Sequence, residues 1–138
     1  MKKTISALSL LLALLSLFSL VSCDGNTIDS SALWEHAIYR KDVTLGNGAK
    51  TVEVEVKAGE DAITVTLKTD KEKLGEALLE HNLIEGENGL YTKVNGITAD
   101  YNVDKSYWGF YQSGELMIVG MDETPISDGD HYELIYTK

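Results

Sequence analysis

Two apolar runs joined by a pair of turn-forming residues constrain the fold of this chain most. The first run, residues 107–111, contains Trp108 and is rich in aromatic side chains, and the second covers residues 116–119. Ser113 and Gly114 stand between the two runs, and a two-residue connection that includes glycine is typical of a tight β-hairpin. The stretch therefore predicts two antiparallel strands in the C-terminal half of the chain.

A second hairpin is predicted before the middle of the chain. In residues 51–57, valines alternate with charged or polar residues at period two, and residues 63–68 repeat this alternation with β-branched side chains. Such a pattern indicates strands with one buried and one wet face. Residues 58–61 supply the turn, so the two runs are expected to pair antiparallel.

The apolar pattern then changes to helical spacing. The residues that share one helical stripe are Leu74, Ala77, Leu78 and His81. Residues 69–72 match a capping box, and the helix should end near Asn82. Further strands are expected at residues 90–94 and 132–136. Residues 32–40 are interpreted as an edge strand, with a short helix as the alternative.

These elements together predict an α+β fold, a β-grasp-like mixed sheet with β-hairpins packed on one main helix. Asn95 and Gly96 follow the strand at 90–94, and Asn-Gly is the favoured pair for a tight turn because both positions adopt positive φ.

The N-terminus has the parts of an export signal. Two lysines precede an apolar run, and residues 20–23 read Leu-Val-Ser-Cys. A transmembrane anchor is the alternative for this run. Cys23 is the only cysteine and cannot form an internal disulfide. Residues 20–23 resemble the lipobox of bacterial lipoproteins, which implies a signal peptide at 1–22 and lipid on Cys23. Residues 23–31 then form the lipidated cysteine and a flexible tether, and residues 32–138 a single domain.

The charge balance excludes some partners. The chain carries a net charge of −10, and removal of residues 1–22 leaves 10 basic and 22 acidic residues, a net charge of −12. Such an acidic surface repels nucleic acid and anionic lipid. We expect a protein on the extracytoplasmic face of the cell membrane, held there by its N-terminal lipid.

The order of motifs between residues 51 and 138 resembles the transcobalamin-like C-terminal domain family. The motifs are the helix, the turn at residues 94–97, Trp108 followed by Tyr111 and a Ser-Gly turn, and Asp-Gly-Asp at 128–130 before an aromatic final strand. This resemblance implies a β-grasp module for soluble ligands, with cobalamin or another corrinoid as the candidate. The family commonly has Asn-Gly where this chain has Ser113 and Gly114. Vertebrate carriers hold cobalamin between this domain and a helical barrel, so we expect a lone β-domain to contact one side of a corrinoid.

The aromatic residues are the main candidates for ligand contact. If Trp108 or Tyr111 is exposed beside the Asn95 turn, the pair would form a flat platform for a planar ligand, a sugar or a peptide. Core packing is the alternative for each ring. The full candidate set is Tyr91, Asn95, Tyr107, Trp108 and Tyr111.

Neither catalysis nor metal binding is expected. The sequence has no nucleophile elbow, phosphate loop or His-Glu-x-x-His motif. The residues considered for a metal site are Asp122, Glu123, Asp128, Asp130 and His131, and their spacing does not match an EF-hand loop. Cobalamin is therefore a candidate bound ligand and not a catalytic cofactor.

The sequence favours a non-catalytic, membrane-anchored binding module for a soluble ligand. A surface adhesion or assembly module that recognises protein or glycan is the alternative.

Overall fold

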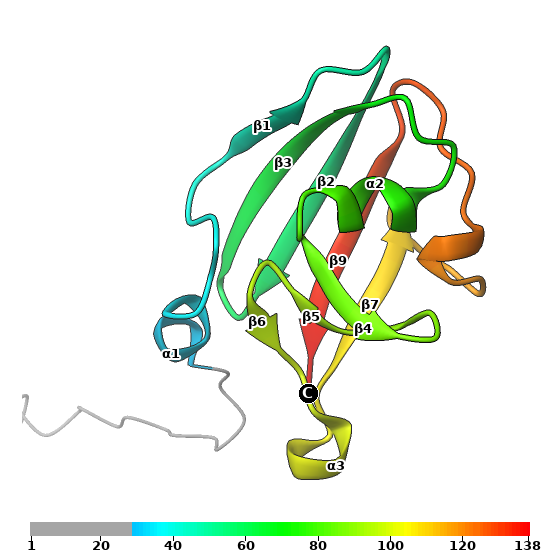
Figure 1. Cartoon of the computed structure of the whole chain (residues 1–138). Helices are drawn as coiled ribbons and strands as arrows, with labels where there is room; N and C mark the ends of the chain where they lie inside the picture. The colour runs from blue at the N-terminus through cyan, green and yellow to red at the C-terminus, as the bar shows by residue number, and fades with distance from the viewer. Residues whose placement is uncertain (1–28) are drawn as a thin grey trace, which may run out of the picture.

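The computed structural model describes residues 29–138, which form two β-sheets and several short helices (Figure 1). The predicted signal peptide and Cys23 lie outside the described residues. The strands are β1 (Val43–Gly46), β2 (Lys50–Ala58), β3 (Asp61–Thr69), β4 (Ile84–Glu87), β5 (Leu90–Val94), β6 (Ile97–Thr98), β7 (Tyr107–Gln112), β8 (Glu115–Leu116) and β9 (His131–Thr137). The helices are α1 (Ser30–Trp34), α2 (Leu74–Glu80), α3 (Tyr101–Asp104) and the 3₁₀ helix η1 (Met121–Glu123). The predicted α+β class is confirmed.

The large sheet is mixed, as predicted. Its six strands follow the order β1-β3-β2-β9-β7-β8, and the small sheet has the order β4-β5-β6. β2 and β3 form the predicted antiparallel hairpin, whereas β2 pairs in parallel with β9, and β1 in parallel with β3. β7 pairs antiparallel with both β9 and β8.

The alternation of apolar and charged residues in β2 determines which face of the sheet is buried. Val52, Val54, Val56 and Ala58 are buried, while Glu53 and Lys57, which alternate with them, are exposed. One face of the sheet therefore joins the core and the other meets solvent.

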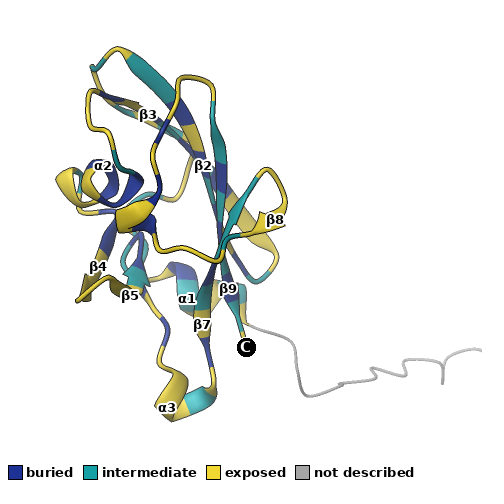
Figure 2. Cartoon of the chain, turned by 90° about the vertical axis from the view of Figure 1, so that its right-hand side faces the viewer, coloured by how far each residue is buried: buried dark blue, intermediate teal, exposed yellow. Residues whose placement is uncertain are grey.

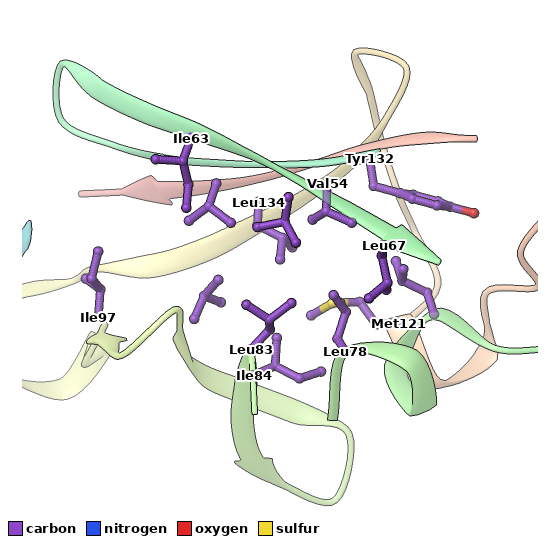
Figure 3. Close-up of a cluster of buried hydrophobic side chains, with 14 of the residues drawn as sticks. Val54, Ile63, Leu67, Leu78, Leu83, Ile84, Ile97, Met121, Tyr132 and Leu134 are labelled. Atoms are coloured by element: carbon purple, nitrogen blue, oxygen red, sulfur yellow. The ribbon is translucent and has the colours of Figure 1, made fainter. Parts of the chain in front are cut away.

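The core lies between the large sheet and a layer made of α2 and the small sheet (Figures 1 and 2). Figure 3 shows Leu134 and Val54 of the large sheet facing Leu78 of α2 and Leu83 and Ile84 beside it. Every buried side-chain nitrogen and oxygen in residues 29–138 has a hydrogen-bond partner. None of the helices in this part of the chain has the length and apolar character to cross a membrane.

Several local predictions were wrong. Residues 32–40 form no strand, and the alternative of a short helix is confirmed for residues 32–34 only. Asp29 accepts hydrogen bonds from the Ser31 and Ala32 amides and starts this helix, α1. Ser30 and Ser31, the last residues of the predicted tether, belong to this helix.

The capping box at residues 69–72 does not form either. Thr69 pairs with Lys50 as the last residue of β3, and its hydroxyl accepts from the Lys71 amide instead. α2 begins at Leu74, and no side chain caps it. In the aromatic hairpin, only Glu115 and Leu116 form the second strand.

Candidate ligand site

Asn95 is a buried clamp that fixes the N-terminal strap, our name for residues 29–40. Its backbone has φ of +50°, and the following Gly96 has φ of +81°, which confirms the predicted turn. The Asn95 Oδ1 accepts from the Tyr39 amide at 2.9 Å, and its Nδ2 donates to the Tyr39 carbonyl at 2.8 Å. The side chain is fully buried. Both ends of the amide are therefore already used inside the protein.

Trp108 lies behind this turn, on the core face of β7. Its indole Nε1 donates to the Ile97 carbonyl at 3.1 Å, and its ring meets Tyr136 edge-on with centroids 5.5 Å apart. The side chain is half-buried. Trp108 thus supports β6 from the inside, and it does not present a free flat face.

Tyr107 and Tyr111 lie on the opposite, solvent-facing side of β7. Residues an odd number of positions apart on a strand point to opposite faces, so Trp108 and Tyr111 cannot stand side by side. A Cβ on Gly109 would come within 2.9 Å of the Tyr111 ring, which shows that this ring lies across Gly109. The platform predicted from Trp108 and Tyr111 is therefore not formed.

Tyr91 is the fifth candidate and lies on β5 of the small sheet. Its hydroxyl donates to the Asp122 carboxylate. Burial raises the pKa of Tyr91 to about 12, and the hydrogen bond and negative charge of Asp122 act in the same direction. Tyr91 is thus a neutral donor committed to η1. The five sequence candidates do not converge on one site.

A hollow opens between the N-terminal strap and the turn at Asn95. Its volume is about 360 Å³, and its lining residues are Leu33, His36, Lys93, Gly96, Ile97 and Thr98. Leu33 is half-buried and gives the hollow an apolar side, whereas His36 and Thr98 are exposed at the rim, and Ile97 is buried in the core behind it. The Lys93 ammonium is 3.3 Å from the Glu85 carboxylate. The lining of this hollow is mixed, with somewhat more polar than apolar surface.

Gly96 is needed where the strap crosses this hollow. A Cβ at this position would stand 2.2 Å from the His36 carbonyl oxygen, and φ is positive. The strap therefore packs directly on the turn, which fixes the distance between Leu33 and Ile97.

A second hollow, of about 250 Å³, lies on the other side of the strap. It is lined by Ser31, Trp34, Glu35, Arg40, Asp61, Ala62 and Ile63. The Trp34 indole donates to the Ala58 carbonyl at 2.9 Å, and Arg40 donates to the Glu35 carbonyl at 2.9 Å. The strap thus contributes walls to both hollows, although sequence reasoning placed no site there.

Two of the acids considered for a metal site, Asp128 and Asp130, accept hydrogen bonds from the protein itself. Asp128 accepts from the Thr51 amide at 2.7 Å, and Asp130 accepts from the Ser127 amide and the Tyr132 hydroxyl. Burial raises the pKa of Tyr132, and Asp130 adds to that effect. Within residues 29–138, no group of three or more His, Cys, Asp or Glu side chains is placed to hold a metal ion.

The fold is that of a domain of haptocorrin, whose structure in complex with Cbi superposes with a TM-score of 0.51 at 18% identity. That match covers 68% of this chain but only 26% of haptocorrin, so the chain spans about a quarter of that protein.

A nearer relative is a protein from Ruminococcus gnavus ATCC 29149, described as a "putative metal binding protein". It is 34% identical, with a TM-score of 0.62, and the match covers 65% of this chain and 98% of the other. The chain belongs to the same family as this Ruminococcus protein. No family model and no curated protein matches the sequence.

Proposed function

We propose that this protein is a non-catalytic, lipid-anchored extracytoplasmic module that binds a small soluble ligand in the hollow between the N-terminal strap and Gly96. The observation that carries the proposal is the composition of this hollow, in which half-buried Leu33 lies beside the polar side chains of His36 and Thr98. Haptocorrin shares the fold, and its complex with Cbi makes a corrinoid the first ligand to test. Membership of the transcobalamin-like C-terminal domain family is part of this proposal.

The anchor places this hollow near the membrane. Cys23 and Asp29 are six positions apart, so the chain between them spans at most about 20 Å even when fully extended. A lipid on Cys23 would keep the strap, and the hollow beside it, close to the lipid surface. Such a position suits capture of a ligand before its delivery to a membrane component.

The experiment is a calorimetric titration of residues 24–138 with cobinamide, a truncated corrinoid, and with cobalamin. Thr98→Trp fills the hollow from its exposed rim, and Thr44→Trp makes the same change at an exposed position of β1. We expect a saturable heat in the wild type and in Thr44→Trp, but not in Thr98→Trp. The absence of heat at millimolar corrinoid would reject the corrinoid as the ligand.

A surface assembly module is the second candidate function. The observation that favours it is the apolar outer edge of the large sheet at β8, where Leu116 and Ile118 are exposed.

A further inference from the structure

The large sheet ends at β8, and the outer side of this strand is open. Gln112 pairs with Glu115 next to the turn, and the Met117 amide donates to the Phe110 carbonyl at 2.9 Å. Because backbone groups alternate in direction along an antiparallel strand, the amide and carbonyl of Leu116 point away from β7. β8 therefore presents backbone groups that another strand can pair with.

Apolar side chains accompany this open edge. Leu116 is 64% exposed, and Ile118 directly after β8 is 98% exposed. Leu116 pairs with Tyr111, so the two side chains share the solvent-facing side of the sheet, where Tyr107 also lies. We call Tyr107, Tyr111, Leu116 and Ile118 the edge strip. Figure 2 shows β8 as an exposed projection at the margin of the sheet.

β8 is only two residues long and includes Glu115, and both features limit strand recruitment at a free edge. The other common protections are absent. Proteins usually guard a free edge with lysine, proline or a bulge, because an apolar edge recruits other strands. Here β8 contains neither lysine nor proline, and its pairing with β7 is regular. An apolar edge left open in this way indicates an interaction surface.

The charge of the segment that carries the edge strip indicates the kind of partner. Residues 106–137 contain no lysine or arginine but carry six acids, Glu115, Asp122, Glu123, Asp128, Asp130 and Glu133. Glu115 lies in β8 itself, and the Glu133 carboxylate accepts from the Gly114 amide at 3.1 Å, directly at the turn. His131 is the single basic side chain of this segment, and it lies 3.4 Å from both Glu53 and Glu133.

A second copy of the chain fits this surface poorly. It would bring the same acids against Glu115 and Glu133, and each chain without residues 1–22 has 10 basic and 22 acidic residues, a net charge of −12. Opposed like charges disfavour such a contact and favour a basic partner.

We propose that β8 is a docking edge for an extended peptide segment of a partner protein in which apolar residues alternate with lysine or arginine. The segment pairs its backbone with Leu116 and extends the large sheet by one strand. Its apolar side chains pack on Tyr111 and Leu116, and its basic side chains point to the other face of the sheet, on the side of Glu115. The edge is separate from the hollow at Gly96, so this inference is independent of the proposed ligand.

The test uses residues 24–138, which contain all of the helices, strands and core described above. The probe is a fluorescein-labelled ten-residue peptide that alternates valine and lysine, followed by fluorescence anisotropy. Leu116→Lys and Ile118→Lys place positive charge on the edge. Leu90→Lys is the matched control, because Leu90 is 71% exposed on β5 of the other sheet. We expect binding to weaken at least tenfold in the two edge variants and to stay within twofold in the control, with circular dichroism unchanged in all three.

Two comparisons make the test decisive. A peptide that alternates valine and glutamate should not bind, and raised salt should weaken the valine-lysine peptide. The proposal is overturned if the valine-lysine peptide fails to bind at millimolar concentration, if both peptides bind equally, or if the edge variants bind like the wild type. It is also overturned if light scattering shows a dimer that Ile118→Lys dissociates, because a second copy would then occupy the edge.

Discussion

The hydrogen bonds of the clamp at Asn95 predict how much stability is lost when this side chain is removed. Replacement by glycine keeps the backbone conformation, because glycine adopts positive φ freely. It removes the hydrogen bonds to the Tyr39 amide and carbonyl. Tyr39 is half-buried, so water replaces these partners only in part, and each lost bond should cost about 1 kcal/mol. We therefore expect Asn95→Gly to lower the free energy of unfolding by about 2 kcal/mol.

Alanine at the same position adds a backbone penalty. A non-glycine residue other than Asn or Asp pays about 1–2 kcal/mol in the left-handed region. We therefore expect Asn95→Ala to cost about 3–4 kcal/mol in total. Urea unfolding followed by tryptophan fluorescence measures both variants, since Trp34 is part of the strap and Trp108 supports the turn. A loss below 0.5 kcal/mol in Asn95→Gly would refute the clamp.

Three further predictions concern pH and packing. The raised pKa of Tyr91 means that its neutral form stabilises the fold fully below pH 10 and that this stability is lost as pH rises towards 12. Tyr91→Phe should lack this loss in urea unfolding measured across that pH range. A variant with the same pH profile as the wild type would contradict the prediction. Hydrogen bonds from the Ser106 hydroxyl and amide hold the pKa of Asp104 below 3.8, so its contribution to stability is present above that value and is lost as pH falls through the lowered pKa. The free energy of unfolding of Asp104→Asn should therefore decline less in acid, by the same measurement. An equal decline in the variant and the wild type would count against the prediction. Leu78→Ala should lower the free energy of unfolding by about 2–5 kcal/mol in thermal or urea unfolding, because Leu78 is fully buried under the large sheet. A loss under 1 kcal/mol would mean that the core is packed differently.

The parts of the fold that the sequence predicted are those specified by neighbouring residues. The alternation in β2 and β3 could only bury its valines in a sheet, and both tight turns followed from residue types that tolerate positive φ. Asn95, Gly96, Ser113 and Gly114 all have positive φ, as expected. Local chemistry was sufficient in each case.

The start of α2 could not be predicted locally. The Leu74 amide donates to the carbonyl of Thr124 at 2.9 Å, and Lys73 bridges to Pro125. These partners are some fifty residues away in the chain, so a tertiary contact, and not the predicted capping box, determines where the helix begins. The strap was mispredicted for a related reason, because it is held by Asn95 and not by strand pairing.

The platform of Trp108 and Tyr111 conflicts with the period of a strand, because two residues three positions apart face opposite sides of the sheet. The aromatic run at residues 107–111 is continuous, yet the sheet divides it between the core and the solvent. The hollow at Gly96 is built from two segments that are distant in sequence, the strap around Leu33 and the β5–β6 hairpin at residues 93–98. Neither segment indicates a site alone, and the hydrogen bonds of Asn95 hold them together.

The clamp also connects stability with the proposed function. Leu33 and His36 belong to the strap, whereas Gly96 and Ile97 belong to the small sheet, so the hollow exists only while the strap is docked. A ligand that touches both walls binds the docked state alone and must stabilise it in proportion to its concentration over Kd. Asn95→Gly, which weakens docking without touching the hollow's lining, should therefore weaken ligand binding as well as folding. A variant that unfolds more easily but binds cobinamide as tightly as the wild type would place the ligand away from the strap.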